Sequence, residues 1–435
     1  MKTLAKMFAV LFASVIIGTL LIIVVYLLPV SAIQEHLRDS IDVLLKEGVR
    51  NSWAAFSYTR PLRDMSGSSF SSVLKTARPY AISDGFTDGI MFSKAAYKSN
   101  NPLNDAMMIP SLGFKSDSEF SNPIETLAKS LDESMRDKAV ISNYARYWHG
   151  YLVYLKPLLY VMGIPGVRVL NLILQIIMFT LIVAKISRMK GTAYSLAFAF
   201  GVLVIDPIST AICIQYSNVY YVMLFMFLVM LSRNDRLREN GGYCVLFMLG
   251  GILTAYLDLL TYPSTVLGMS TVLYLLLNND MTLGRKIFDM FKLGFSWCFG
   301  YAGMWSGKWL ISYLMTGYDT IADALKAASS RTGGGIYGLS LSWHWLFSHL
   351  WPVMVMLCVL LVLVSIAVYV SIRKGRTSAA EVVPMLLVAL YPFVWYAVMK
   401  QHSFIHYFFT HKNLAVTAFA LSCVAVKCSG YKSHE

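Results

Sequence analysis

The chain has 435 residues, of which 57% are hydrophobic and only 14% are charged, and its net charge is +13. This composition excludes an ordinary soluble domain, in which about a quarter of the residues are charged. The positive charge does not indicate a nucleic-acid partner, because the basic residues form short clusters between apolar runs. Several of these runs reach about 18 residues, the length needed to cross a hydrocarbon core of roughly 30 Å. Because the runs are continuous, they exclude a β-barrel and predict an all-α polytopic membrane protein.

Cysteine usage gives no sign of a disulfide-stabilised protein. The six cysteines lie in or beside the apolar runs, and none lies in the one long polar segment. The sequence also has no CxxC pair and no Cys and His residues at a spacing typical of a metal site.

Residues 1–30 predict a first transmembrane helix. Lys2 and Lys6 precede the apolar run 8–30, which is longer than the core of a signal peptide and precedes no small-residue cleavage site. We therefore expect this helix to be retained, with its N-terminus in the cytoplasm. That orientation places the polar segment 31–157 on the extracytoplasmic side.

This polar segment is expected to form a partly helical loop domain. Residues 33–49 have the apolar spacing of an amphipathic helix, and residues 123–139 are also expected to be helical. Residues 57–72 are typical of a loop, and residues 100–105 form a cluster of turn-forming residues. Aromatic residues crowd the stretch 142–160, which is typical of a helix lying at the level of the lipid headgroups.

Nine further apolar runs predict a transmembrane bundle over residues 158–427. Basic clusters occur at every second turn, so the positive-inside rule places the tail 428–435 in the cytoplasm. Because the third, fourth and sixth spans are short, the total is given as about ten transmembrane helices. The nine expected spans are residues 165–185, 192–206, 217–232, 243–260, 264–278, 294–316, 352–372, 382–399 and 412–427.

Two acidic residues of the polar segment, Asp84 and Asp88, are candidate catalytic carboxylates. Residues four apart share a helical face, and Gly85 and Gly89 leave the backbone beside each carboxylate open to a bulky polar ligand. The alternative is structural: Asp84 caps a helix N-terminus and Asp88 is a solvated acid in its first turn.

The outer face predicted by this topology collects most of the histidines and several aspartates, which indicates that it is the working surface. Asp258 and Lys308 are the two charges placed deepest in the apolar runs. Because an unpaired charge is costly in such surroundings, each marks a candidate binding site. Alternatively, Lys308 snorkels to the interface and Asp258 lies wholly among the headgroups.

The run 400–412 is the second constellation on the outer face. His402 and His406 are one helical turn apart, and Lys400 and Lys412 flank the run. Cations, imidazoles and aromatic rings at headgroup level suit a lipid-linked phosphate or pyrophosphate. A metal site is a weaker alternative, because no HExxH glutamate is present, and a structural aromatic belt is another.

Lys326, Arg331 and the glycines 333–335 form a smaller basic feature on an outer loop. Glycine-rich backbone beside cations can wrap a phosphate, but this stretch is not a Walker motif. A flexible loop is the favoured interpretation.

The order of these features resembles the GT-C superfamily of integral-membrane glycosyltransferases over the whole chain. A first transmembrane helix is followed by a large outer loop with acidic residues and then by a bundle of spans. Its most specific parts are Asp84-Gly85-Phe86-Thr87-Asp88 and Gln401-His402-Ser403-Phe404-Ile405-His406-Tyr407.

One departure concerns the acidic residues. Many members of the superfamily carry adjacent acids soon after the first span, where this chain has only Glu35 and Asp39. Asp84 and Asp88 follow some fifty residues later, so Glu35 and Asp39 are kept as second candidates for the base.

The resemblance implies an inverting transfer of a sugar from a polyprenyl-phosphate donor to a glycan or lipid-linked acceptor at the membrane. Asp84 or Asp88 would act as the general base, while cations stabilise the departing lipid phosphate. No cofactor is certain, and a divalent cation, Mg²⁺ or Mn²⁺, is compatible with this chemistry. The expected substrate-binding residues are Asp258, Arg146, His149, Lys308, Lys400, His402, His406 and Tyr407.

Three other functions stay open. A flippase or transporter of lipid-linked oligosaccharides would line a path across the membrane with charges, but only Asp258 and Lys308 approach the interior. A polysaccharide polymerase would carry its large outer loop late in the chain, whereas here the large loop is the first. The third alternative is a non-catalytic scaffold for an envelope complex.

Overall fold

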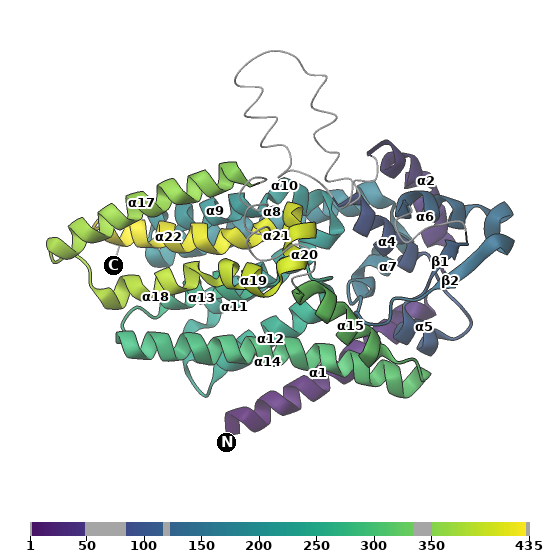
Figure 1. Ribbon diagram of the computed structural model, residues 1–435, viewed down its shortest axis with the longest axis horizontal. Helices are drawn as coiled ribbons and strands as arrows, with labels where there is room; N and C mark the ends of the chain where they lie inside the picture. Colours follow the sequence, from purple (N-terminus) through teal and green to yellow (C-terminus); the bar gives the residue numbers. More distant parts are fainter. Residues whose placement is uncertain (1, 48–83, 116–121, 334–349, 432–435) are drawn as a thin grey trace, which may run out of the picture.

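The computed structural model describes residues 2–47, 84–115, 122–333 and 350–431. Within these ranges nearly all regular structure is helical, and one pair of short strands is the only sheet. Long helices form a bundle, and the first polar segment forms a smaller domain at one end of it (Figure 1). The prediction of an all-α membrane protein is thus confirmed in outline, with the strand pair as an addition.

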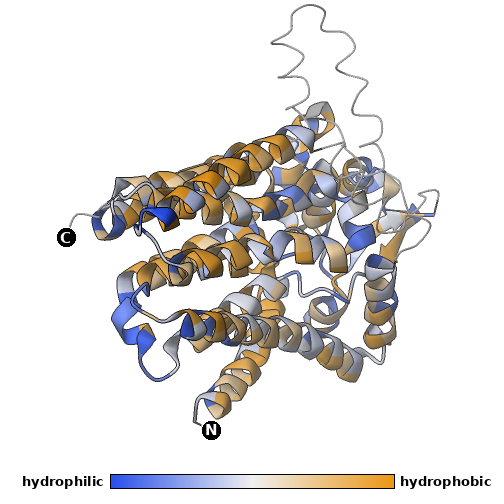
Figure 2. Cartoon of the chain, turned by 60° about the vertical axis from the view of Figure 1, so that its left-hand side comes forward, coloured by the Kyte–Doolittle hydropathy of each residue, from blue (hydrophilic) through white to orange (hydrophobic). Residues whose placement is uncertain are grey.

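Within the described ranges, six stretches of helix are long and apolar enough to cross a membrane. Exposed apolar side chains such as Phe12, Ile176 and Leu363 give them the surface that lipid requires. Figure 2 shows apolar residues along most of the bundle, with hydrophilic residues gathered at the turns. The six stretches are α1 (Lys2–Leu27), α8 (Ile164–Lys190), α11 (Ile214–Arg238), α17 (Trp351–Arg373), the pair α18 (Ala379–Ala389) and α19 (Tyr391–Val398), and the run of α21 (Tyr407–Thr410), η4 (His411–Leu414) and α22 (Ala415–Cys428).

The other four predicted spans also form helices, but the count of about ten spans is not confirmed. Helices α9 (Thr192–Ile205), α12 (Gly242–Leu257) and α13 (Ser264–Leu277) have 14, 16 and 14 residues. These lengths fall short of the roughly 20 residues that a transmembrane helix needs. Helix α14 (Leu283–Thr316) has 34 residues but is not among the six apolar stretches.

The predicted span 382–399 is interrupted. Helix α18 ends at Ala389, and α19 begins two residues later with Pro392 in its first turn. Proline lacks the N–H that would continue the hydrogen bonds of α18, so the helix breaks at this point.

Helices α12 and α14 pack so closely that their backbones touch. A Cβ atom at Gly251 would lie 2.1 Å from the carbonyl oxygen of Trp297, and one at Gly300 would lie 2.1 Å from that of Met248. Only glycine permits this approach, so α12 and α14 are in direct backbone contact in the bundle.

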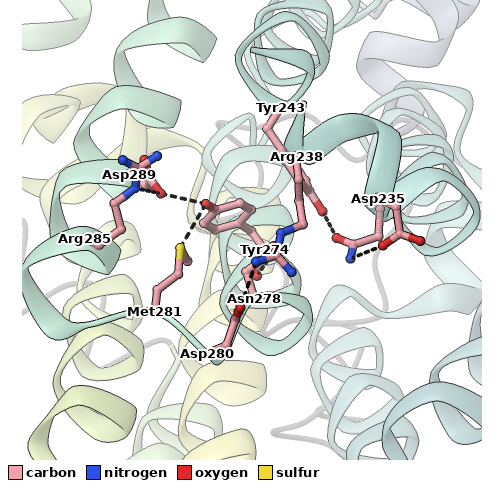
Figure 3. Close-up of polar contacts among 10 residues, drawn as sticks. Asp235, Arg238, Tyr243, Tyr274, Asn278, Asp280, Met281, Arg285 and Asp289 are labelled. Atoms are coloured by element: carbon pink, nitrogen blue, oxygen red, sulfur yellow. Dashed lines mark hydrogen bonds and ion pairs between the residues drawn. The ribbon is translucent and has the colours of Figure 1, made fainter. Parts of the chain in front are cut away.

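The turns predicted to face the cytoplasm are held together by a polar cluster (Figure 3). Arg238 at the end of α11 pairs with Asp280 in the turn after α13 at 2.9 Å. On α14, Asp289 accepts hydrogen bonds from the hydroxyl of Tyr274 at 2.8 Å and from Nε of Arg285 at 2.9 Å. The Arg238–Asp280 pair is exposed and adds little stability by itself, but it links the α11–α12 turn to the α13–α14 turn.

The loop domain contains one antiparallel pair of short strands, β1 and β2, in which Ser111 lies opposite Ser142. The predicted amphipathic helix is confirmed as α2, which buries Ile33, Leu37 and Leu44. The elements of this domain are α2 (Ser31–Glu47), α4 (Gly85–Ala95), α5 (Pro102–Met108), β1 (Ser111–Phe114), α6 (Pro123–Leu131), η3 (Glu133–Lys138), β2 (Ala139–Ser142) and α7 (Leu152–Val161).

Two predicted elements of this domain are partly wrong. The expected turn 100–105 opens helix α5, because the side chain of Asn101 accepts a hydrogen bond from the backbone N of Asn104 at 3.1 Å and caps it. The expected helix 123–139 stops at Leu131, where Asp132 caps the 3₁₀ turn η3 that leads into β2. The predicted loop 57–72 lies outside the described residues.

The aromatic stretch before α8 is largely inside the protein, so its prediction as a headgroup-level helix is wrong for its largest residues. Tyr147, Trp148 and Tyr151 are each at most 1% exposed. Nε1 of Trp148 donates to the carbonyl of Met304 on α14 at 2.7 Å. These contacts hold the loop domain against the bundle.

Three short helices complete the junction between the loop domain and the bundle (Figure 1). They are α10 (Pro207–Ile212), α15 (Thr320–Thr332) and α20 (Lys400–Ile405).

Candidate functional site

A cavity of about 120 Å³ lies where the loop domain meets the bundle. It brings Asp84 of the loop domain together with His402 and His406 of the segment between α19 and α21, which are the two motifs singled out by the sequence. The lining residues are Asp84, Phe86, Thr87, Ile90, Tyr144, Tyr147, Gln215, Leu259, Arg331, His402, His406 and Phe409.

Asp84 is the carboxylate that lines this cavity. It caps helix α4, accepting hydrogen bonds from the backbone N of Thr87 at 3.1 Å and from its hydroxyl at 2.7 Å. Burial raises the pKa of Asp84 from 3.8 to about 7, although the bonds from Thr87 oppose the rise. A carboxyl group that titrates near neutral pH is suited to act as a general base. The structural reading of Asp84 as a helix cap is confirmed, and the same residue also faces the cavity.

Asp88 points elsewhere and does not line the cavity. Its two oxygens accept hydrogen bonds from the backbone amides of Ile214 and Gln215, both at 3.1 Å, at the start of α11. Asp88 is only 1% exposed, so the alternative that it is a solvated acid is wrong. Burial raises its pKa to about 6, while Arg168 and these hydrogen bonds act in the opposite direction. Asp88 thus fastens α4 of the loop domain to α11 of the bundle.

His402 presents a hydrogen-bond acceptor at the cavity. Its Nε2 lies 2.7 Å from the carbonyl oxygen of Leu260, and because a carbonyl only accepts, Nε2 must carry the proton. Burial and the neighbouring His406 lower the pKa of His402 well below its usual value, so the ring is neutral and Nδ1 accepts.

His406 is also neutral. Its ring stacks on Phe409 with centroids 5.0 Å apart and an interplanar angle of 16°. Burial lowers its pKa to about 3, and the positive charge of Arg331 acts in the same direction. The two imidazoles are therefore uncharged, and any positive charge in the cavity must come from another group.

Arg331 is the cation of this cavity, and the sequence interpretation missed it. Residue 331 was assigned to a flexible loop, but it lies in the last turn of α15. Its guanidinium lies 5.5 Å from the ring centre of Tyr147, and no carboxylate pairs with it among the described residues. Asp319 as an N-cap followed by the alanine-rich residues 320–332 was the sequence signal for a helix here.

Several buried polar atoms at the cavity have no partner in the described part of the chain. They are Nδ1 of His402, Nδ1 of His406 and Oε1 of Gln215. Buried polar atoms are normally hydrogen-bonded, so this pattern is what a bound polar ligand would satisfy.

Two further cavities adjoin the first. One, of about 300 Å³, shares Arg331 with it and is bordered by Tyr301, Trp305 and Trp309 of α14. The other, of about 410 Å³, lies within the loop domain and shares Phe86, Ile90 and Tyr144. The 120 Å³ cavity therefore lies between an apolar space beside the bundle and a more polar space in the loop domain.

The predicted deep cation Lys308 is held by the loop domain. Its Nζ donates to the carbonyls of Ala106 and Met107, each at 3.0 Å, near the end of α5. Lys412 is held in the same manner by the carbonyl of Ile205 at 2.6 Å and the hydroxyl of Ser209 at 2.7 Å. Neither ammonium group lines the cavity.

Asp258 and His149 do not line the 120 Å³ cavity, but each holds a segment that does. The carboxylate of Asp258 accepts from the backbone N of Thr261 at 2.9 Å and from its hydroxyl, which fixes the turn that carries Leu259 into the cavity. Nδ1 of His149 lies 2.8 Å from the hydroxyl of Tyr151, and Nε2 lies 3.2 Å from the carbonyl of Tyr144.

The remaining predicted residues lie around the site without facing it. Arg146 pairs with Asp323 of α15 at 3.3 Å and lines the 300 Å³ cavity. Lys400 and Tyr407 do not line the 120 Å³ cavity. Neither do the second-choice acids Glu35 and Asp39, which lie on the exposed face of α2.

The described residues contain no group of three or more His, Cys, Asp or Glu side chains arranged to hold a metal ion. Among the described residues that line the 120 Å³ cavity, Asp84 is the one acidic residue. A divalent cation there would need oxygens of a substrate phosphate as further ligands.

Comparisons of the chain with protein-family models, with curated proteins and with solved structures found no match. The function is therefore inferred from the residues of the site.

Proposed function

We propose that the protein is an inverting membrane glycosyltransferase that moves a sugar from a polyprenyl-phosphate donor to a hydroxyl group of a glycan or lipid-linked acceptor on the extracytoplasmic face. The observation that carries the proposal is the 120 Å³ cavity lined by both Asp84 and Arg331. Such a transfer needs a base for the acceptor and a cation for the departing phosphate, and the cavity offers one of each.

In the proposed reaction, the carboxylate of Asp84 removes the proton of the acceptor hydroxyl while its oxygen attacks the anomeric carbon opposite the phosphate. A new glycosidic C–O bond forms as the C–O bond to the phosphate breaks, so the configuration inverts. The electron pair leaves with the phosphate as polyprenyl monophosphate, and the guanidinium of Arg331 stabilises the growing negative charge. The proton remains on Asp84.

The 300 Å³ cavity supports a lipid-linked donor. Its aromatic wall of Tyr301, Trp305 and Trp309 suits an isoprenoid chain, and Arg331 lies at its boundary with the 120 Å³ cavity. A ligand with an apolar chain, a phosphate and a sugar in series would thus meet apolar, cationic and polar groups in the same order.

The neutral side chains suit the sugar. Nδ1 of His402 accepts a hydrogen bond from a sugar hydroxyl but cannot donate one to a phosphate oxygen in this tautomer. The free amide oxygen of Gln215 is a second acceptor. His402 therefore acts on the sugar, and Arg331 acts on the phosphate.

The test is transfer by purified protein in liposomes, supplied with synthetic polyprenyl-phosphate sugars and an acceptor. We expect release of polyprenyl phosphate and a loss of about 10²- to 10⁴-fold in rate for Asp84→Asn, since general-base catalysis contributes this much. Asp137→Asn, which changes an exposed acid of η3, is the matched control. Adding a chelator to the same assay tests the requirement for Mg²⁺ or Mn²⁺.

Two results would overturn the proposal. One is equal turnover of a soluble nucleotide sugar without any lipid carrier. The other is movement of the lipid-linked sugar across the bilayer with no transfer, which would favour a flippase.

A further inference from the structure

The cavity of about 410 Å³ in the loop domain has no role in the chemistry of Asp84 and Arg331. It lies between α4, α6 and the β1–β2 strand pair, and its size falls within the roughly 300–1,000 Å³ typical of ligand pockets. Phe86, Ile90 and Tyr144 form a shared wall with the 120 Å³ cavity. A ligand in the larger cavity would therefore end close to Asp84.

A buried ammonium group stands at the wall of this cavity. Lys94 is 3% exposed, and its Nζ donates to the hydroxyl of Ser111 at 2.8 Å and to the carbonyl of Ser142 at 3.2 Å. Both partners are neutral, and no carboxylate pairs with Lys94 in the described part of the chain. Lysine is seldom buried this fully without a charged partner. Lys308 is also buried with neutral partners, but Lys94 differs from it because Lys94 lines a cavity that can hold an anion.

The structural interpretation of Lys94 is that it links α4 to the β1–β2 strand pair. That reading accounts for the two hydrogen bonds, but an apolar residue or a neutral hydroxyl would join the same elements without burying a charge. It also accounts for only two of the three N–H groups of the ammonium in the described part of the chain. An anion in the cavity accounts for both features.

The other lining groups fit a saccharide. The rings of Phe86, Phe114 and Tyr144 offer flat apolar surfaces for the C–H faces of sugar rings. Asn143 and Thr126 add hydrogen-bonding groups beside them.

We propose that this cavity binds the acceptor, and that the acceptor is a saccharide with a negatively charged group that pairs with Lys94. Naming the ligand as the acceptor rests on the proposed glycosyl transfer, whereas the binding itself does not. The charge is a carboxylate, as in a uronic acid, or a phosphate substituent, and the two are separated by the choice of probe.

Binding should depend on pH. Burial lowers the pKa of Lys94 to about 7, so the empty site is partly neutral at pH 7.5 and an anion would draw a proton onto it. Tyr144 and His149 are the titratable groups that face Lys94 from the segment after β2. His149 stays neutral because burial lowers its pKa, and no charged group of α2, α6, α7 or α11 shifts the pKa of Lys94.

The experiment is calorimetric titration of the full-length protein in lipid nanodiscs. The probes are a uronic-acid oligosaccharide, a neutral oligosaccharide of equal length, and that neutral oligosaccharide carrying one phosphate. We expect a charged probe to bind about 10- to 100-fold more tightly than the neutral one, and Lys94→Met to remove this difference. Lys138→Met, at an exposed position of η3, is the matched control.

A second measurement does not depend on any variant. Titrations of the wild type in buffers of different ionisation enthalpy at pH 7.5 should show proton uptake with a charged probe and none with the neutral probe. Equal affinity of the wild type for charged and neutral probes in these titrations would overturn the inference.

The two proposals fail separately. Charge-selective binding without transfer from any lipid-linked donor would contradict the proposed glycosyl transfer but would support anion binding at Lys94. Transfer to neutral and charged acceptors at equal efficiency would leave the glycosyltransferase standing and remove the role of Lys94.

Discussion

The carboxylate of Asp88 accepts a hydrogen bond from the backbone amide of Gln215 at 3.1 Å, and the side chain of Gln215 lines the cavity that holds Asp84. The two residues are far apart in the sequence, and their hydrogen bond joins the loop domain to the bundle. Because Asp84 and Asp88 lie one turn apart on α4, this contact also fixes where Asp84 stands.

We expect Asp88→Ala to destabilise the protein. The change removes the cap of α11 and leaves two buried amides without acceptors, which costs about 1–3 kcal/mol. Asp88→Asn retains one acceptor oxygen and should cost less. Thermal unfolding in detergent measures both, with Asp137→Ala as the exposed control. An Asp88→Ala variant as stable as wild type would contradict the capping role.

Asp84 should make stability depend on pH. Folding raises its pKa from 3.8 to about 7, so the folded state binds the proton more tightly than the unfolded state. The resulting stabilisation is complete below about pH 3.8 and is lost as the pH rises through about 7. Asp84→Asn cannot ionise, so we expect it to be more stable than wild type at pH 8, by up to roughly 4 kcal/mol.

The measurement for Asp84 is the unfolding midpoint of both proteins at pH 5 and pH 8. Asp88 also titrates in this range, but it is present in both proteins and cancels from the comparison. If the unfolding midpoints of the two proteins change equally between pH 5 and pH 8, ionisation of Asp84 does not affect stability.

Arg331→Gln should weaken use of the donor. A hydrogen bond to a charged group contributes about 1.5–3 kcal/mol, so we expect kcat/KM for the donor to fall by about 10- to 100-fold. Inhibition by the product polyprenyl phosphate should weaken in parallel, which a merely structural role of Arg331 would not produce. Arg136→Gln, on the exposed surface of η3, serves as the control.

The 300 Å³ cavity should discriminate among lipid chains. Ala328 lines it, so Ala328→Trp fills part of the space that we assign to the isoprenoid. We expect turnover of a long-chain donor to fall while a donor with a very short chain is used as before. Ala322→Trp lies on the same helix, α15, outside the cavity and should change neither rate. Equal losses with both donors would remove the lipid from this cavity.

Cysteine labelling in intact cells tests the orientation. In a background without the exposed Cys298 and Cys358, Asn100→Cys should react with an impermeant reagent, and Arg236→Cys should react only after permeabilisation. The reverse pattern would place the cavity of Asp84 in the cytoplasm and contradict the proposed donor.

The helices were predictable because apolar runs and capping residues are local signals. The long apolar runs became α8 and α17, and the apolar spacing of residues 33–49 became the amphipathic helix α2. Asp84 and His402 were selected by residue type, and the fold brings them to one cavity.

The partners of the charged residues were not predictable from the sequence. Lys308 and Asp88 bind backbone groups, and every residue carries such groups, so no residue type marks the partner. Which carboxylate faces the cavity depends on how α4 is rotated against α11, and a spacing of four residues leaves that rotation undetermined. Arg331 was missed because its importance comes from the end of α15 being folded over the cavity.

The hydrogen bonds from Lys308 to α5 also set an order of events during synthesis. Residue 308 leaves the ribosome about 200 residues after Ala106, a delay of roughly 10–40 s at usual elongation rates. Throughout that interval the end of α5 and the indole of Trp148 lack their partners on α14. The end of α5 is therefore made early but is among the last parts of the loop domain to become stable, and a chain that stops before α14 cannot complete it.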